Sequence, residues 1–115
     1  MIIKNQTKDV ILVEHGKVAN TFFTRLKGLL GSPPLETGEG LLLTKEKSVH
    51  TFFMGFPIDV IYINQALEVI KIDPNLRPFK IGSYVSKSAY ILEIAAGVAE
   101  TTNTIVGDQL VFIKN

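Results

Sequence analysis

The sequence predicts a mainly β protein, a single-domain antiparallel β-sandwich or barrel-like fold with one short helix near residues 21–30. Short runs of β-branched and aromatic residues recur along the chain, and turn-forming residues separate them at the spacing of a sandwich or barrel. No long crossover helices separate these runs, which disfavours a parallel α/β sheet. With 115 residues, 46% of them hydrophobic and none of them cysteine, residues 1–115 are expected to form one core without disulfides.

The predicted strands are the six runs in which apolar β-formers dominate. They cover residues 10–13, 41–43, 60–63, 69–72, 90–94 and 110–113. Turns are expected at residues 16–17, 64–65, 73–75 and 107–108, where Gly, Asn, Asp and Pro are concentrated.

The helix is predicted over residues 21–30, where apolar side chains repeat at helical spacing. Asn20 is a suitable N-cap, and Gly31 with the following prolines ends the segment. Arg25 lies at the edge of the apolar stripe, so its side chain is expected to face partly inward. A shorter helical turn is expected at residues 96–102.

Composition excludes several functional classes. The formal net charge is +1, which gives no global attraction for nucleic acid. Without cysteine, and with only His15 and His50 as histidines, neither a metal site nor another cofactor is expected. No phosphate-loop or serine-hydrolase motif is present. The sequence also lacks an export signal and the roughly 20-residue apolar stretch of a membrane span, which predicts a cytoplasmic protein without a membrane partner.

His50 is the first polar residue in an unusual context. If residues 48–54 form a strand, Ser48, His50, Phe52 and Met54 share one face and Thr51 lies on the other. Aromatic residues fall on both faces, so His50 is expected to be partly covered. Its imidazole is either a general base or ligand-binding group, or a core-edge histidine bonded to a carbonyl.

Two carboxylates also stand within apolar runs. Asp59 shares a strand face with Ile61 and Ile63, and it either accepts backbone N–H groups from the preceding turn or orients His50. Glu93 lies among apolar residues on both sides, where an unpaired charge is costly. Arg25 is the first candidate partner for Glu93, and the alternatives are a structural ion pair or a site.

These residues together resemble domain of unknown function family 192, a small prokaryotic family. The resemblance rests on Ala19, residues 21–25, Gly28-Leu29, residues 40–42, 50–54 and 57–60, Leu92-Glu93, Ala96-Gly97, Ile105 and Gly107-Asp108. It implies a mostly β, sandwich-like fold with one short helix and no established activity. In the commoner form of the pattern, a tryptophan precedes the methionine and lysine and asparagine follow it. Here Phe53 and Gly55-Phe56 occupy those places.

The preferred interpretation is a non-catalytic domain that binds a small molecule or a protein partner. Its polar cleft is framed by the helix and a hairpin over residues 48–59, with Arg25, His50, Thr51, Asp59 and Glu93 at its walls. One alternative is a hydrolase-like enzyme using His50 with Asp59 or Glu93. A second is a protein-interaction accessory that uses an exposed strand edge or the apolar residues 52–56. The sequence leaves the oligomeric state open.

Overall fold

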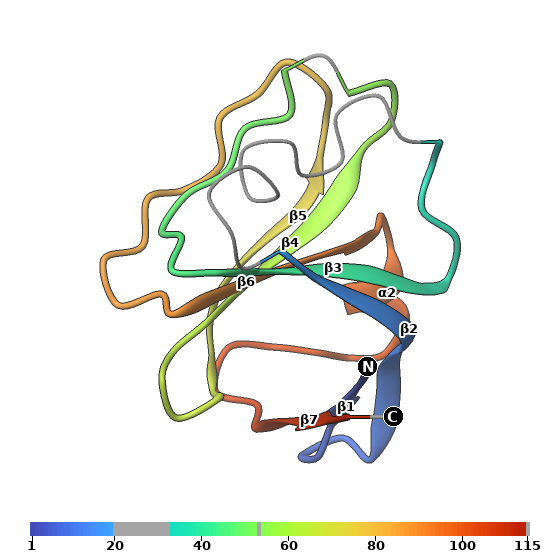
Figure 1. Ribbon diagram of the computed structural model, residues 1–115, viewed down its shortest axis with the longest axis vertical. Helices are drawn as coiled ribbons and strands as arrows, with labels where there is room; N and C mark the ends of the chain where they lie inside the picture. Colours follow the sequence, from blue (N-terminus) through green and yellow to red (C-terminus); the bar gives the residue numbers. More distant parts are fainter. Residues whose placement is uncertain (20–32, 53, 115) are drawn as a thin grey trace.

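One curled sheet of seven strands forms a half-barrel, which confirms the predicted mainly β fold (Figure 1). The computed structural model describes residues 1–19, 33–52 and 54–114. The strands are β1 (Ile2–Asn5), β2 (Val10–Ala19), β3 (Gly38–Thr44), β4 (Ile58–Ile63), β5 (Val69–Leu76), β6 (Tyr90–Ala95) and β7 (Leu110–Ile113). They are hydrogen-bonded in the order β5-β4-β6-β3-β2-β1-β7. A short helix, α2 (Val98–Thr101), follows β6 and confirms the helical turn predicted at residues 96–102.

The two edge strands of this sheet approach each other where β5 begins. An isolated bridge pairs Glu68 with Gln109, and the Val69 N–H donates to the Asp108 carbonyl over 2.9 Å. The Asp108 carboxylate accepts a hydrogen bond from the Asn5 side chain at 2.9 Å and pairs with Lys8 at 3.0 Å. These contacts hold the curl and give the sheet an inner and an outer face.

Most neighbouring strands are antiparallel, as predicted, but β2 and β3 run parallel. Their register places His15 opposite Glu39 and Lys17 opposite Leu41. A parallel pair needs a connection that returns the chain to the same end of the sheet. Residues 20–37 connect these two strands, and the predicted helix at residues 21–30 falls within that connection, outside the described residues.

Several strand boundaries differ from the prediction. Strand β1 was not predicted, and β2 continues through the turn expected at residues 16–17. Gly16 lies against the chain terminus, because its N–H donates to the Met1 carbonyl at 2.9 Å and an added Cβ would meet that oxygen at 3.2 Å. Strand β5 likewise runs through the turn expected at residues 73–75, which an edge strand tolerates despite Pro74.

Apolar side chains pack on both faces of the sheet. The inner-face cluster includes Leu42, Ile61, Ile63, Leu92 and Ile94. The outer-face cluster includes Leu41, Leu43, Ile58, Val60, Tyr62 and Ile91, together with Met54 and Phe56 from a loop. Strand β4 is therefore buried along its whole length, and alternate residues contribute to alternate clusters.

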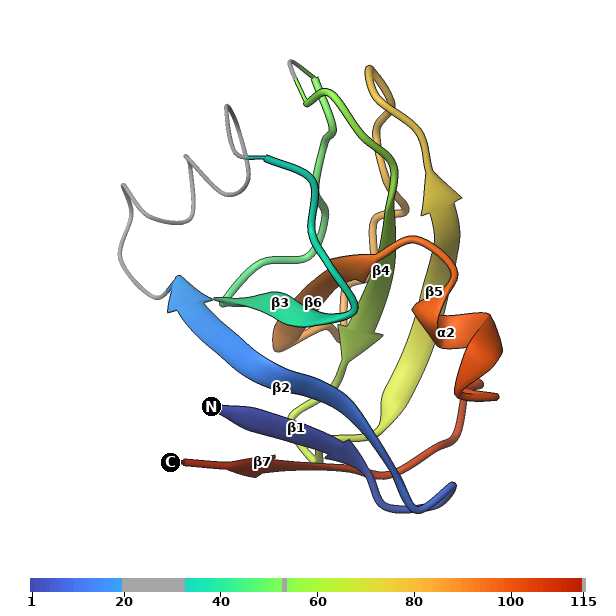
Figure 2. The same cartoon turned by 90° about the vertical axis from the view of Figure 1, so that its right-hand side faces the viewer.

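Long loops rise from the sheet on the side of the outer face (Figure 2). Residues 48–54 were expected to form a strand, but in the described part of this segment only His50 is paired, in an isolated bridge with Ile81. The expected hairpin over residues 48–59 is therefore wrong, because regular pairing starts only at Ile58. Strand alternation fails here as well, since Phe52 is 37% exposed whereas Met54 is buried.

Candidate functional site

Glu93 is a buried carboxyl group on the outer face. Strand register places it between Leu41 of β3 and Val60 of β4. The residue is 4% exposed, and its Oε1 atom has no hydrogen-bond partner among the described residues. Burial raises the pKa of Glu93 to about 7, because the charged form loses its hydration. Near neutral pH this carboxyl therefore exists in both protonation states.

Asp59 lies on the adjacent strand but on the inner face, with Ile61 and Ile63 as the alternation predicts. Oδ1 accepts the Asn75 N–H at 2.8 Å, and Oδ2 accepts the N–H groups of Gly97 and Ala99 at 3.0 and 2.9 Å. The carboxylate thus joins β4 to β5 and to the start of α2. These donors come from distant segments rather than from the preceding turn, and none of them is His50.

His50 is exposed, contrary to the partial burial that the sequence predicted. Its Nδ1 accepts the Phe52 N–H at 3.3 Å, and its ring lies 5.3 Å from the Phe52 ring, centroid to centroid. A nitrogen that accepts a hydrogen bond carries no proton, so Nδ1 offers no N–H to an orienting carboxylate. An orienting carboxylate would therefore have to accept from Nε2, and no carboxylate of the described residues does so.

Thr51 is fully buried and fastens one loop to another. Its hydroxyl donates to the Arg77 carbonyl and accepts the Lys80 N–H at 2.9 Å. Its own carbonyl accepts the Phe79 N–H at 3.0 Å. We call this set of contacts the Thr51 clamp, and it positions residues 77–80 over the sheet.

Of the predicted site residues, the four that the structure describes, His50, Thr51, Asp59 and Glu93, do not form one cluster. Asp59 pairs with Ile94 and Val60 pairs with Glu93, so the two carboxyl groups lie on opposite faces of neighbouring strands. His50 and Thr51 lie outside the sheet, where they contact Ile81 and Lys80 of another loop. Arg25 lies outside the described residues, so its expected pairing with Glu93 stays a prediction.

A second polar group on the outer face was not predicted. The Tyr62 hydroxyl donates to Asp73 Oδ2 at 2.8 Å, and Ser83 donates to the same carboxylate through its N–H and its hydroxyl, both at 2.7 Å. Burial, followed by the Asp73 hydrogen bond, raises the pKa of Tyr62. Burial also acts to raise the pKa of Asp73, but the hydrogen bonds from Ser83 and Tyr62 outweigh it and hold that pKa below its usual value. Gly82 must be small here, because an added Cβ would lie 2.7 Å from the Tyr62 hydroxyl.

The Asp73 carboxylate lies in the same row of cross-strand neighbours as Glu93. Leu41 pairs with Glu93, Glu93 with Val60, and Val60 with Asp73, so the row crosses four strands. The sequence signal was Tyr62 in one predicted strand and Asp73 directly after the next one, but Asp73 was assigned to a turn. The extension of β5 through this turn brings it into the row.

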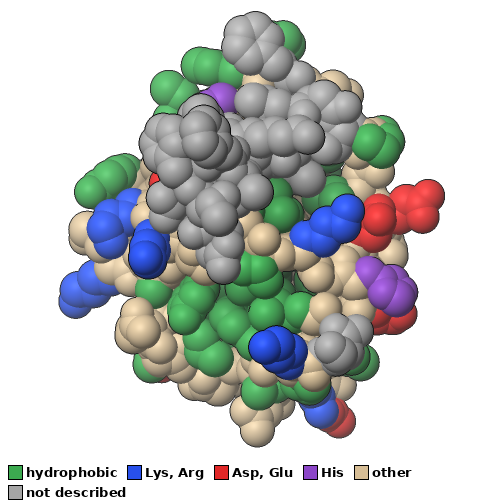
Figure 3. Space-filling model, in the orientation of Figure 1, with side chains coloured by type: hydrophobic (Ala, Val, Ile, Leu, Met, Phe, Trp, Pro, Cys, Tyr) green, Lys and Arg blue, Asp and Glu red, His purple; other side chains and the backbone are tan. Residues whose placement is uncertain are grey.

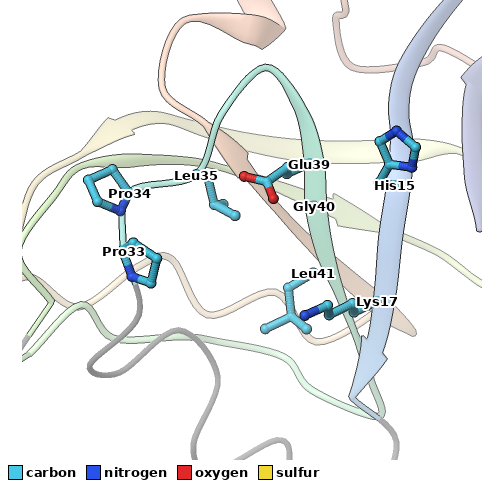
Figure 4. Close-up of a pocket in the computed structure, with 8 residues that line it drawn as sticks. All are labelled: His15, Lys17, Pro33, Pro34, Leu35, Glu39, Gly40 and Leu41. Carbon is cyan, nitrogen blue, oxygen red and sulfur yellow. The ribbon is translucent and has the colours of Figure 1, made fainter.

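A cavity of about 160 Å³ opens beside this row, at its Leu41 end. It lies between the parallel strands β2 and β3 and the segment formed by residues 33–35 (Figure 4). Among the described residues, its lining includes His15, Lys17, Pro33, Pro34, Leu35, Glu39, Gly40 and Leu41. The sequence did not predict this site, because a turn was expected at residues 16–17. In the structure β2 is continuous there, which places His15 and Lys17 on the same strand face.

Across residues 1–19, 33–52 and 54–114, no three His, Cys, Asp or Glu side chains lie close enough to hold a metal ion. Within the same ranges, no helix has the length and apolar character needed to cross a membrane. The polar groups described above on the outer face are Glu93, the Tyr62–Asp73–Ser83 group and the charged side chains that line the cavity.

Solved structures with this architecture come from two bacteria. A protein of unknown function from Novosphingobium aromaticivorans matches with a TM-score of 0.84 and 20% identity, over 96% of this chain and 82% of that chain. A putative transcription regulator from Sinorhizobium meliloti matches with a TM-score of 0.78 and 20% identity, over 96% and 89% of the two chains. At this identity the likeness concerns the fold alone.

Sequence relatives are archaeal proteins named only as UPF0127 proteins. The Thermococcus sibiricus protein is 34% identical over 112 residues, which cover 92% of this chain and 71% of that protein. The Pyrococcus furiosus protein is 32% identical over 111 residues, which cover 92% and 93% of the two chains. The model of domain of unknown function family 192, described as "Uncharacterized ACR", matches residues 2–112. The match extends over nearly the whole sequence and confirms the resemblance, so the chain belongs to this family.

Proposed function

We propose that this protein binds a small ligand on the outer face of the sheet without transforming it. The observation that carries the proposal is Glu93, a buried carboxyl group whose Oε1 has no partner among the described residues. Its register neighbour Leu41 lines the cavity of about 160 Å³. A concave site with apolar walls and a few polar groups is the usual form of a small-molecule site.

The energetic cost of Glu93 supports a functional role. An unsatisfied buried polar group costs about 1–3 kcal/mol, and more when the group is charged. An apolar residue would fit the cluster of Leu41 and Val60 without that cost. Buried titratable groups with shifted pKa values concentrate at functional sites, where a ligand supplies the missing partner.

The same geometry argues against the hydrolase-like alternative. A general base needs an orienting group within hydrogen-bond reach. The described hydrogen bonds of Asp59 all go to backbone N–H groups, on the face opposite Glu93. His50 Nδ1 accepts a backbone hydrogen bond of its own. These positions favour binding over general-base chemistry.

A thermal-shift screen against sugars, nucleotides and short carboxylates tests the proposal. A ligand present at 100 times its Kd adds about 2.7 kcal/mol to the stability, which raises the Tm measurably. Leu35→Trp places a larger side chain in the cavity wall and should abolish the shift. Ile113→Trp, an equal change at an exposed position of β7, should retain it. If no compound raises the Tm of the wild type, the proposal is rejected.

One observation favours protein interaction as a second candidate function. The apolar side chains of Phe79, Ile81 and Tyr84 are 64%, 71% and 74% exposed. Hydrophobic side chains reach the surface at this loop end of the molecule (Figure 3). Of the residues 52–56 that suggested such a surface, Met54 and Phe56 are buried. The candidate interaction surface therefore consists of Phe79, Ile81 and Tyr84 rather than of residues 52–56.

The loop is held firmly while it presents these side chains. The Thr51 clamp fixes residues 77–80, and Asp73 holds Ser83. An Ile81→Ser variant should lose a bound protein in a pull-down, whereas Val18→Ser, which alters an exposed apolar residue of β2, should retain it. Equal recovery of the partner with both variants would exclude the loop as its docking surface.

A further inference from the structure

The cavity between β2 and β3 carries charges that select one class of ligand. Strand register places His15 opposite Glu39 and Lys17 opposite Leu41, so these side chains are cross-strand neighbours. The segment of residues 33–35 forms the facing wall, and Figure 4 shows Lys17 and Glu39 directed into the space between them. The site thus has an apolar wall on one side and a charged edge on the other.

The apolar part sets the size of the ligand. Leu35, Leu41 and the two prolines line a cavity of about 160 Å³. An apolar protein cavity of roughly 150 Å³ accommodates benzene. A ligand body of one small ring, or a branched aliphatic group of similar size, therefore matches this space.

The charged edge determines the sign of the ligand's charge. The Lys17 ammonium forms no hydrogen bond or ion pair with the residues that the structure describes. The Glu39 carboxylate, in contrast, accepts the Glu36 N–H at 2.9 Å through Oε1. Among the described residues that line the cavity, the exposed Lys17 ammonium is therefore the cation available to a ligand, and the His15 imidazole on the same strand face offers a further N–H.

Glu39 limits how much negative charge the site tolerates. It lies on β3 two residues from Leu41, which is the cross-strand neighbour of Lys17. A second anionic group on the ligand would meet this carboxylate at short range, and like charges that close repel each other. A single carboxylate directed at Lys17 avoids that repulsion.

We propose that this cavity binds a small monocarboxylate, with its apolar body against Leu35 and Leu41 and its carboxylate at Lys17. This inference rests on the proposed ligand-binding function and names the ligand class. An ionised carboxylate and an ammonium group form charge-assisted hydrogen bonds, which are about twice as strong as neutral ones.

Titration of the full chain with four ring compounds, followed by amide and methyl NMR, tests the ligand class. Benzoate should shift the Leu35 and Leu41 signals, and benzyl alcohol should bind about tenfold more weakly because it lacks the charge. Isophthalate, with two carboxylates, should also bind more weakly than benzoate. Benzylamine should bind most weakly, because its ammonium group faces Lys17.

Matched variants separate the ligand class from the function. Lys17→Met should weaken benzoate about tenfold and leave benzyl alcohol unchanged, while Lys87→Met, at an exposed lysine of another loop, should change neither. If all four compounds bind equally, or if Lys17→Met leaves benzoate unaffected, the carboxylate proposal is wrong and ligand binding stands. If none of the compounds shifts the cavity signals, the cavity is not the ligand site.

Discussion

Replacing Glu93 by Gln should make the protein more stable at pH 8 than the wild type, with little difference near pH 5. Burial raises the pKa of Glu93 from 4.5 to about 7. Between these two values the folded protein holds a proton that the unfolded chain has released. Stability therefore falls as the pH rises through this window, and Gln, which cannot ionise, removes that dependence.

The size of the effect follows from the pKa shift. Each pH unit between 4.5 and about 7 contributes about 1.4 kcal/mol. The wild type should thus lose about 3 kcal/mol relative to Glu93→Gln across the window. The side chain is only 4% exposed, so solvent screens this contribution little.

Urea unfolding followed by circular dichroism measures the difference, since the chain contains no tryptophan. For a urea m-value of about 1–3 kcal/mol/M, the midpoints of the two proteins should separate by roughly 1–3 M between pH 5 and 8. Asp73 and Asp108 have lowered pKa values and Tyr62 a raised one, so these groups do not titrate within this range. Glu14→Gln, at an exposed carboxylate of β2, should leave the pH dependence unchanged.

Two results would refute the reasoning. Parallel stability curves for the wild type and Glu93→Gln would mean that the carboxyl does not titrate between pH 5 and 8. A variant less stable than the wild type at pH 8 would mean that Glu93 is charged and paired with a cation, as the predicted Arg25 ion pair requires. In that case an Arg25→Met variant should reproduce the loss.

Three further substitutions test the roles assigned above. Asp59→Asn should destabilise the protein by about 2–3 kcal/mol in urea unfolding, because an amide nitrogen cannot accept the backbone N–H groups, and an unchanged midpoint would refute that anchoring role. Thr51→Val keeps the shape but removes the clamp hydroxyl, so hydrogen exchange at Lys80 should accelerate, whereas unchanged protection would show that the hydroxyl is dispensable. Gly40→Ala places a Cβ 2.8 Å from a Val13 methyl and should cost about 1–3 kcal/mol, which equal thermal stability would contradict.

The strands that the sequence predicted most completely are those made almost entirely of apolar residues. Strand β7 has the predicted bounds and β6 is one residue longer than predicted, because runs of Val, Ile, Leu and Phe need no distant partner to be recognised. Strand β1 escaped prediction because its four residues include Lys4 and Asn5. Asn5 is buried through its bonds to Thr104 and Asp108, about a hundred residues away, and local patterns carry no information about such contacts.

The predictions for the loop residues were wrong for the same reason. Residues 48–54 alternate like a strand, yet Thr51 forms its hydrogen bonds with residues 77–80, which hold the segment out of regular pairing. Asp59 was placed on the correct face by the period of two, but its donors lie 16, 38 and 40 residues further along the chain. Alternation predicts which face a side chain occupies, whereas its partners depend on the tertiary fold.

The contrast between Asp59 and Glu93 supports the proposed ligand site on the outer face. Both are carboxylic acids buried to a similar degree on neighbouring strands, one register position apart. The fold supplies Asp59 with three backbone N–H donors, so its burial is explained by the structure alone. Glu93 Oε1 receives no donor from the described residues, although Leu41 and Val60 beside it would pack equally well around an apolar side chain. A carboxyl group that folding does not require, next to a cavity, is best explained by a partner that binds there.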